Sequence, residues 1–307
     1  MTLRIAVGPS SFAAEDDTPL RMLASAGCEV VPNPFGRRLN EDEIIRHLEG
    51  IDGLIAGLEP LNRKVLSSAP GLKAIARVGI GMTNVDFEAA RESGVKVSNT
   101  PDGPVNAVAE MTLTALLALS RNLVATNAAL HAGEWKKSIG TGLTGAKVLL
   151  IGFGRIGRKT GELLRAFGAE LAVYDPYIGA GSVPEGVEAV STLDAGLKSA
   201  EIVSLHASGN DCILDARAFA AMGGGVILLN SARGELVDEQ ALVDALKTGK
   251  VAGAWFDAFW KEPYHGPLTG FEQVLLTPHV GTYTRQCRLA METAAVENLL
   301  RDLGVSR

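Results

Sequence analysis

The sequence has few cysteines and no spacing of them that suggests a metal site. Its 307 residues include only three, Cys28, Cys212 and Cys287, which are far apart, odd in number and without a CxxC pair. This excludes a disulfide framework and a zinc site built on cysteines. We expect reduced thiols, no bound metal and a cytoplasmic protein.

Runs of basic residues and long apolar runs are also missing. With 29 Lys and Arg against 35 Asp and Glu, the net charge is −6, so nucleic acid is not an expected partner. The most apolar segment, residues 107–122, contains Glu110 and is shorter than the roughly 20 residues of a membrane span. The N-terminal MTLRIAVGPS lacks the basic start and apolar stretch of a signal peptide. We expect neither membrane insertion nor export.

Short apolar runs alternate with helix-length segments along the whole chain. Runs in the first third are RIAVG, CEVVPN, GLIAG, KAIARVG and VKVSNT, followed later by AKVLLIG, ELAVYD, EIVSLHA, GVILLN, GAWFDA and VLLTPH. Strands separated by helices predict parallel sheets covered on both faces, and the later runs lack the alternation of half-exposed strands. The length favours two domains.

The domain boundary is predicted near Thr100. Residues 97–110, VSNTPDGPVNAVAE, hold two prolines and a glycine before a long apolar helix. The last helix, at 285–304, is not obviously needed by the second sheet, so we expect it to return to the first domain. The predicted domains are therefore 1–100 with 284–307, and 101–283.

Three closely spaced glycines stand between a predicted strand and a predicted amphipathic helix. In LLIGFGRIGRKTGELL, residues 149–164, Gly152 permits a sharp turn, Gly154 lets the backbone approach a pyrophosphate, and Gly157 lets the helix pack close to the strand. The free N–H groups of the helix would then face the anion. The plainer alternative is a tight strand-to-helix turn without a ligand.

An acid follows at the end of the next apolar strand. Asp175 lies about 20 residues after the glycines, where a carboxylate accepts hydrogen bonds from a ribose diol and repels the additional phosphate of NADP. We therefore predict NAD as the cofactor, the alternative being that Asp175 only caps a loop. Arg155, inside the glycine loop, either helps to hold the pyrophosphate or lies in solvent.

Three residues supply the groups that hydride transfer to a carbonyl needs. Arg233 follows a buried strand and can bind a carboxylate through two hydrogen bonds. His279 follows another strand and can exchange a proton near neutral pH. Glu262 can bind one imidazole nitrogen and favour the protonated ring. Each residue also has a plainer alternative when it is taken singly. Arg233 would form a surface ion pair, His279 would be a loop histidine with its own partners, and Glu262 would be a solvated acid.

Together these pieces resemble the D-isomer-specific 2-hydroxyacid dehydrogenases, most closely the phosphoglycerate dehydrogenase branch. The matching stretches are ARVGIGMTNVD, SNTPDGPVNAVAE, IGFGRIGRK, YDP, EIVSLH, LLNSARGELVDEQAL, FDAFWKEP and LLTPHVG. They occur in the order of the family and span most of the chain. The resemblance implies a Rossmann-type NAD-binding domain, a smaller flavodoxin-like substrate domain with a cleft between the two, and a homodimer joined through the cofactor domain.

The resemblance also assigns roles to residues. It implies a catalytic set of Arg233, Glu262 and His279. It implies substrate binding by the backbone N–H groups of Val78 and Gly79. Arg77 beside them is a candidate ligand for a substrate phosphate, the alternative being a surface cation. The cofactor-binding residues that it implies are Gly152, Gly154, Arg155, Ile156, Gly157, Asp175, His206, Ala232 and Asp257, with Asp257 facing the nicotinamide amide.

Departures from the family pattern leave the substrate open. An arginine for phosphate often follows the GLIA strand, but here Gly57, Leu58 and Glu59 follow it. The loop after His206 is shorter than usual, and Pro104 replaces an asparagine. We predict oxidation of 3-phosphoglycerate, with hydroxypyruvate or glyoxylate reduction as the alternative. An NAD(H)-sensing, corepressor-like binding protein is the alternative from another class, since fold alone does not settle function.

Overall fold

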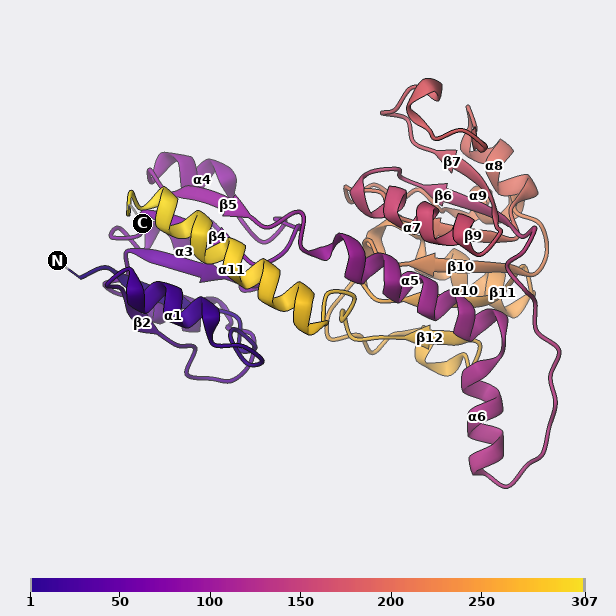
Figure 1. The fold of residues 1–307 in the computed structure, drawn as a ribbon, viewed down its shortest axis with the longest axis horizontal. Helices are drawn as coiled ribbons and strands as arrows, with labels where there is room; N and C mark the ends of the chain where they lie inside the picture. Colours follow the sequence, from indigo (N-terminus) through magenta and orange to yellow (C-terminus); the bar gives the residue numbers. More distant parts are fainter. Residues whose placement is uncertain (1, 306–307) are drawn as a thin grey trace. The chain divides into compact units, whose positions relative to one another are not determined.

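The chain folds into two α/β units, shown in a computed structural model that describes residues 2–305 (Figure 1). The first unit runs from the N-terminus to Pro104 and resumes at Tyr283, and the second comprises Val105–Thr282. The last helix thus belongs to the N-terminal unit. Each unit has its own parallel sheet, which confirms the predicted fold class.

The first unit is built on a five-stranded parallel sheet of order β2-β1-β3-β4-β5. Its strands are β1 (Arg4–Val7), β2 (Glu29–Val31), β3 (Gly53–Ala56), β4 (Ala74–Arg77) and β5 (Lys96–Asn99). Its helices are α1 (Thr18–Ser25), α2 (Glu41–His47), α3 (Arg63–Ser67), α4 (Phe87–Glu92) and α11 (Arg285–Asp302). The central β3 is buried at all four positions because helices cover both faces of the sheet.

The second unit contains a seven-stranded parallel sheet of order β12-β11-β10-β9-β6-β7-β8. Its strands are β6 (Lys147–Ile151), β7 (Glu170–Tyr174), β8 (Val187–Ala189), β9 (Ile202–Leu205), β10 (Val226–Asn230), β11 (Val251–Phe256) and β12 (Val274–Leu276). Its helices are α5 (Pro104–Ser120), which begins at the last residue of the first unit, α6 (Leu123–His131), α7 (Arg155–Ala166), α8 (Leu193–Ser199), α9 (Ala216–Ala221) and α10 (Glu239–Lys247). Short 3-10 turns are η1 (Ala180–Ser182), η2 (Gly234–Leu236) and η3 (Pro267–Gly270).

Helices α5 and α6 contain the most apolar stretch of the chain. Among the described residues, no single helix is long and apolar enough to span a membrane, and α5 and α6 reach that composition only as a pair bent by 60°. The middle of α5 packs on the second sheet, with Ala115 and Leu116 in the same cluster as Trp255. The predicted buried helix is therefore confirmed for α5.

A buried ion pair ties α11 to the loop that follows β1. The Arg288 guanidinium donates to Glu292 Oε1 at 2.5 Å and to Ser11 Oγ at 3.1 Å, while Glu292 Oε2 accepts a bond of 2.8 Å from the Ala13 N–H. The side chains of Arg288 and Glu292 are only 14% and 4% exposed. Burial raises the pKa of Glu292, and Arg288 opposes that shift. This contact between distant segments adds to the packing of α11 on α1 and on the strands β3, β4 and β5, which joins the C-terminal helix to the N-terminal unit.

Removing one partner of this pair is expected to be costly. In Arg288→Ala the Glu292 carboxyl stays buried without its cation, so the free energy of unfolding should fall by about 3 kcal/mol in urea titrations. Arg285→Ala is the matched control, because Arg285 is 84% exposed in its ion pair with Glu15 and should change stability by less than about 0.5 kcal/mol. Equal effects of the two substitutions would contradict a structural role for the buried pair.

Candidate dinucleotide and catalytic site

The glycine loop lies where the strand order of the second sheet reverses. Strand β6 is followed along the sheet by β7 and β8 on one side and by β9 to β12 on the other. Connections therefore leave β6 and β9 in opposite directions, which opens a crevice beyond their carboxyl ends. In open parallel sheets this is the place where ligands bind. Gly152 directly follows β6, and His206 directly follows β9.

Each of the three glycines is required for a different steric reason. Gly152 has φ +91°, and a Cβ there would lie 2.5 Å from the Ala207 nitrogen. A Cβ on Gly157 would lie 2.3 Å from the Gly152 carbonyl oxygen, because α7 packs closely on the loop. A Cβ on Gly154 would meet no atom of the described residues within 4 Å. Gly154 thus leaves open space at the N-terminus of α7, as backbone contact with a pyrophosphate requires.

Asp175 connects this loop to the end of β7. Its two carboxylate oxygens accept hydrogen bonds of 2.8 Å from the Phe153 N–H and 2.9 Å from the Tyr177 N–H. The half-buried carboxylate therefore shapes both the glycine loop and the turn after β7, and it retains lone pairs for a diol. Arg155 is the first residue of α7 and is exposed, and Ile156 beside it is half-buried.

His206 lies beneath the glycine loop as a neutral ring. Its Nε2 is 2.9 Å from Ser204 Oγ, and its Cβ is 3.4 Å from the Cβ position of Gly157. Part of the residue remains accessible, but its surroundings desolvate the ring, and this burial lowers the pKa to about 4. His206 therefore carries no charge near neutral pH. Its buried Nδ1 has no hydrogen-bond partner among the described residues.

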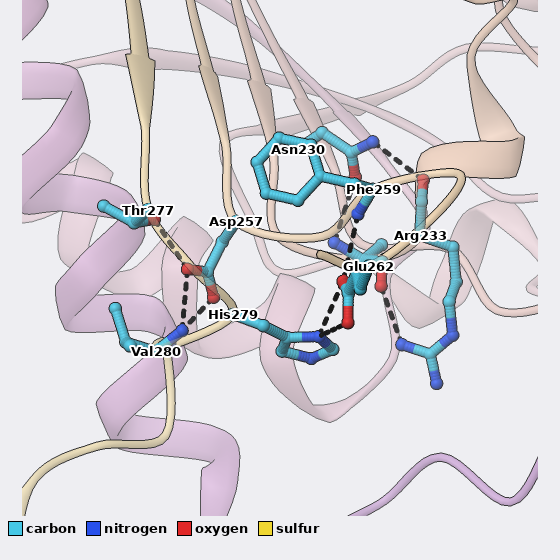
Figure 2. Close-up of polar contacts among 10 residues, drawn as sticks. Asn230, Arg233, Asp257, Phe259, Glu262, Thr277, His279 and Val280 are labelled. Atoms are coloured by element: carbon cyan, nitrogen blue, oxygen red, sulfur yellow. Dashed lines mark hydrogen bonds and ion pairs between the residues drawn. The ribbon is translucent and has the colours of Figure 1, made fainter. Parts of the chain in front are cut away.

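The predicted acid and base meet in space. His279 Nδ1 lies 3.0 Å and 3.2 Å from the two carboxylate oxygens of Glu262, as Figure 2 shows. Glu262 is held in turn by the Phe259 N–H at 3.2 Å. The side chains of His279 and Glu262 are 37% and 28% exposed, so the pair is accessible to a ligand. A carboxylate at Nδ1 selects the tautomer and leaves Nε2 for proton exchange.

Asp257 directly follows β11 and is buried, with hydrogen bonds to both carboxylate oxygens. The residue is only 2% exposed, and its oxygens accept from Thr277 Oγ1 at 2.6 Å, Val280 N–H at 2.9 Å and Gly281 N–H at 2.7 Å. These bonds close the turn on which His279 adopts φ +56°, a conformation rare for a non-glycine residue (Figure 2). Asp257 therefore positions the His279 backbone.

Arg233 follows β10 and is placed by a strand-end amide. Asn230 Nδ2 donates to the Arg233 carbonyl at 2.8 Å, and Asn230 Oδ1 accepts from the Ala232 N–H at 3.0 Å. The Arg233 guanidinium donates to the Ala232 carbonyl at 2.7 Å. Figure 2 shows the side chains of Arg233 and His279 both extending beyond the carboxyl ends of the strands.

Sequence reasoning missed Asn230 and Thr277, which orient the site. Asn230 is fully buried at the last position of β10, and Thr277 directly follows β12 and accepts from Trp255 Nε1 at 2.9 Å. A polar residue that ends an otherwise apolar strand was the available signal, because a buried amide needs partners. The partners themselves come from other strands.

In the first unit, the predicted carboxylate-binding backbone already has internal partners. The Val78 N–H donates to the Ala56 carbonyl at 2.9 Å, and the Gly79 N–H donates to Thr100 Oγ1 at 2.7 Å. In this conformation both N–H groups are therefore engaged within the first unit. The Arg77 guanidinium folds over Gly79 and donates to the Val78 carbonyl at 2.7 Å.

Comparison with known proteins identifies the family. Residues 113–281 match the model of the D-isomer specific 2-hydroxyacid dehydrogenase, NAD binding domain. This match covers more than half of the chain and contains the glycine loop, Arg233, Glu262 and His279. The chain belongs to this family. Its second unit is accordingly an NAD-binding domain.

Relatives named for different activities have similar identity to this chain. The chain is 37% identical to a D-3-phosphoglycerate dehydrogenase of Mycobacterium tuberculosis over 85% of this chain and 51% of that protein. It is 33% identical to a hydroxypyruvate reductase of Thermotoga maritima over 87% and 90% of the two chains. The crystal structure of TT0316 from Thermus thermophilus has a TM-score of 0.89 and 35% identity, covering 98% and 97%. The chain thus spans about half the length of the curated phosphoglycerate dehydrogenases it matches.

The glycine loop yields a binding test that separates ligand contact from packing. Gly154→Ala should weaken NADH binding at least about tenfold, because its methyl group points into the space needed for the pyrophosphate, while the midpoint of thermal unfolding stays near that of the wild type. Gly157→Ala is the matched control and should lower the unfolding midpoint, because its Cβ would collide with Gly152. NADH fluorescence titration measures the first effect. Wild-type affinity in Gly154→Ala would contradict the assignment.

Proposed function

We propose that the protein is an NAD-dependent oxidoreductase that interconverts a small D-2-hydroxy acid and its 2-oxo acid. The observation that carries the proposal is the hydrogen-bonded pair of Glu262 and His279, on the same sheet edge as the glycine loop. The second unit binds NAD, and the first unit binds substrate. The family match and the relatives named above support this assignment.

Three side chains of the second unit divide the chemistry among them. Arg233 binds and polarises the 2-oxo acid through its guanidinium, which matches a carboxylate with two parallel donors. His279 gives a proton from Nε2 to the oxygen on C2 in the reducing direction and removes it in the oxidising direction. Glu262 holds the ring and balances its positive charge. Bound NAD supplies the hydride acceptor, or NADH the hydride, at C2.

Two substrates follow from the relatives. Oxidation of 3-phosphoglycerate is supported by the phosphoglycerate dehydrogenases at 37% identity. Reduction of hydroxypyruvate or glyoxylate is supported by reductases at 33% and 32% identity and by the absence of an arginine at positions 57–59. The identities are too similar to separate them. A panel of 2-oxo acids with NADH separates both from an NAD(H)-sensing binding protein, which would bind NADH tightly and reduce none of them.

The role of His279 can be tested directly. In His279→Ala, kcat for 2-oxo acid reduction should fall about 100- to 10,000-fold, because no other group donates the proton, while NADH affinity stays within about twofold. Glu262→Gln keeps a hydrogen-bonding group but removes the charge, so kcat should fall less in this variant than in His279→Ala. Stopped-flow absorbance of NADH measures the rates. Full activity of His279→Ala would remove the imidazole from the mechanism.

A homodimer is proposed from the exposed apolar residues around α6. Helix α6 extends away from the sheet of its unit (Figure 1). Leu123 and Leu130 on it are 60% and 57% exposed, and Trp135 and Ile139 in the following segment are 80% and 100% exposed. A helix that exposes so many apolar side chains needs a partner surface. A second copy of the chain, related by a two-fold axis, buries the same residues on both subunits, in agreement with the dimers implied by the resemblance.

The dimer proposal has its own test. The double substitution Leu123→Asp and Leu130→Asp should convert the protein to a monomer in sedimentation-velocity ultracentrifugation, because two charges per subunit would be desolvated at the interface. Phe87→Asp is the control, because Phe87 is also exposed, at 54%, but lies in the first unit. A wild-type monomer, or a double variant that stays dimeric, would overturn the proposed interface.

A further inference from the structure

The turn that carries Glu262 begins and ends on two aromatic side chains that stack on each other. The rings of Phe259 and Tyr264 have their centroids 4.5 Å apart and their planes at 20°. Between them, the Glu262 carboxylate folds back and accepts a hydrogen bond of 3.2 Å from the Phe259 N–H. The ring stacking therefore closes the turn from which Glu262 reaches His279.

The hydroxyl group of Tyr264 ties this turn to a helix. It donates a hydrogen bond of 2.6 Å to Glu239 Oε1, on the first residue of α10, and accepts one of 3.1 Å from the Leu268 N–H in η3. Burial, and then the Glu239 carboxylate, raise the pKa of Tyr264, so the phenol stays a protonated donor at neutral pH. A hydrogen bond to a carboxylate is stronger than one between neutral groups. Tyr264 thus joins the Glu262 turn, η3 and α10 through one oxygen atom.

Two glycines let the turn lie close to its neighbours. A Cβ on Gly266 would lie 2.4 Å from the Tyr264 hydroxyl oxygen. A Cβ on Gly234 would lie 2.2 Å from the Trp260 nitrogen, so the backbone of the turn rests on the start of η2. Trp260 Nε1 also donates to the Val237 carbonyl at 2.7 Å. The turn is therefore held against the segment that leads from η2 into α10, and close packing leaves it little room to shift.

We propose that Tyr264 is a positioning residue, which holds the Glu262 carboxylate against the His279 ring without touching substrate or cofactor. The inference rests on the proposed function, in which this pair exchanges the proton. The carboxylate orients the imidazole only while its oxygens stay within hydrogen-bond distance of Nδ1, at 3.0 Å and 3.2 Å. Arg233 is held separately, by Asn230. Loss of the Tyr264 hydroxyl should therefore slow proton transfer and leave substrate binding nearly unchanged.

Tyr264→Phe tests this role, because it keeps the ring and its stacking on Phe259 but removes the hydroxyl group. With NADH and the 2-oxo acid that the wild type reduces fastest, kcat should fall about tenfold, while KM for the acid stays within about twofold. Thr269→Ala is the matched control. It removes an exposed hydrogen bond of 2.9 Å to the Gly266 carbonyl in the same loop, and it should change kcat by less than about twofold.

A double-mutant comparison separates positioning from a general effect on the fold. In a Glu262→Ala background, Tyr264→Phe should lower kcat by less than about twofold, because no carboxylate is left to position. An equal fall of kcat in both backgrounds would overturn the proposal. Glu239→Gln keeps an oxygen that accepts from the phenol, so its kcat should fall less than that of Glu239→Ala, which removes the acceptor. If Tyr264→Phe does not fold, these two Glu239 variants decide the role of the bond.

A measurement on the resting protein keeps the two proposals separable. In protein with isotope-labelled histidine, the nitrogen chemical shifts of His279, assigned by their loss in His279→Ala, report which ring nitrogen carries the proton. At alkaline pH the wild type should hold the proton on Nδ1, and Tyr264→Phe should distribute it over both nitrogens. Unchanged shifts or an unchanged kcat in Tyr264→Phe would overturn the role of Tyr264 and leave the proposed function standing. A wild type that reduces no 2-oxo acid would overturn the proposed function, and the nitrogen shifts would then decide the role of Tyr264.

Discussion

Parallel pairing of every strand places all the chemistry of each unit on one edge of its sheet. In the second unit, the ends of β6 and β9 hold the glycine loop and His206, and the ends of β10, β11 and β12 lead to Arg233, Asp257 and His279. An antiparallel neighbour would send the next connection to the opposite edge. The buried parallel sheet therefore provides a rigid base on which short loops alone determine the site.

At that edge of the second sheet, polar residues hold one another in place through hydrogen bonds. Glu262 contacts the His279 ring, and Asp257 accepts hydrogen bonds from the two backbone N–H groups that follow it. Thr277 links Asp257 to Trp255 in the core. The unusual φ of His279 is maintained because this network specifies it from several directions. The ring and the backbone of His279 are thus fixed by residues from other strands and loops.

In both units the strand order reverses at one point of the sheet, but the residues at that point differ. At the reversal point of the second sheet, open space above Gly154 and the N-terminus of α7 favour an anion. At the reversal point of the first sheet, Glu59 fills the corresponding crevice with a carboxyl group. Two similar frameworks therefore carry different groups at the point where the strand order reverses, and this difference depends on a few residues after the strands.

Local sequence was sufficient for the parallel sheets, the glycine loop and every strand except β8 (Val187–Ala189), because strand and helix periodicity and the steric demands of Gly152 and Gly157 are properties of short segments. The return of the last helix to the first unit was also predicted, but the buried pair of Arg288 and Glu292 that secures it was not. The meeting of Glu262 with His279, the engagement of Asp257 and of the Val78 and Gly79 N–H groups, and the burial of Glu59 depended on tertiary structure. These contacts and this burial arise only when strands and loops that are distant in the sequence pack together. Hydrogen-bond partners and burial were therefore decided by the tertiary structure and could not be predicted from the sequence.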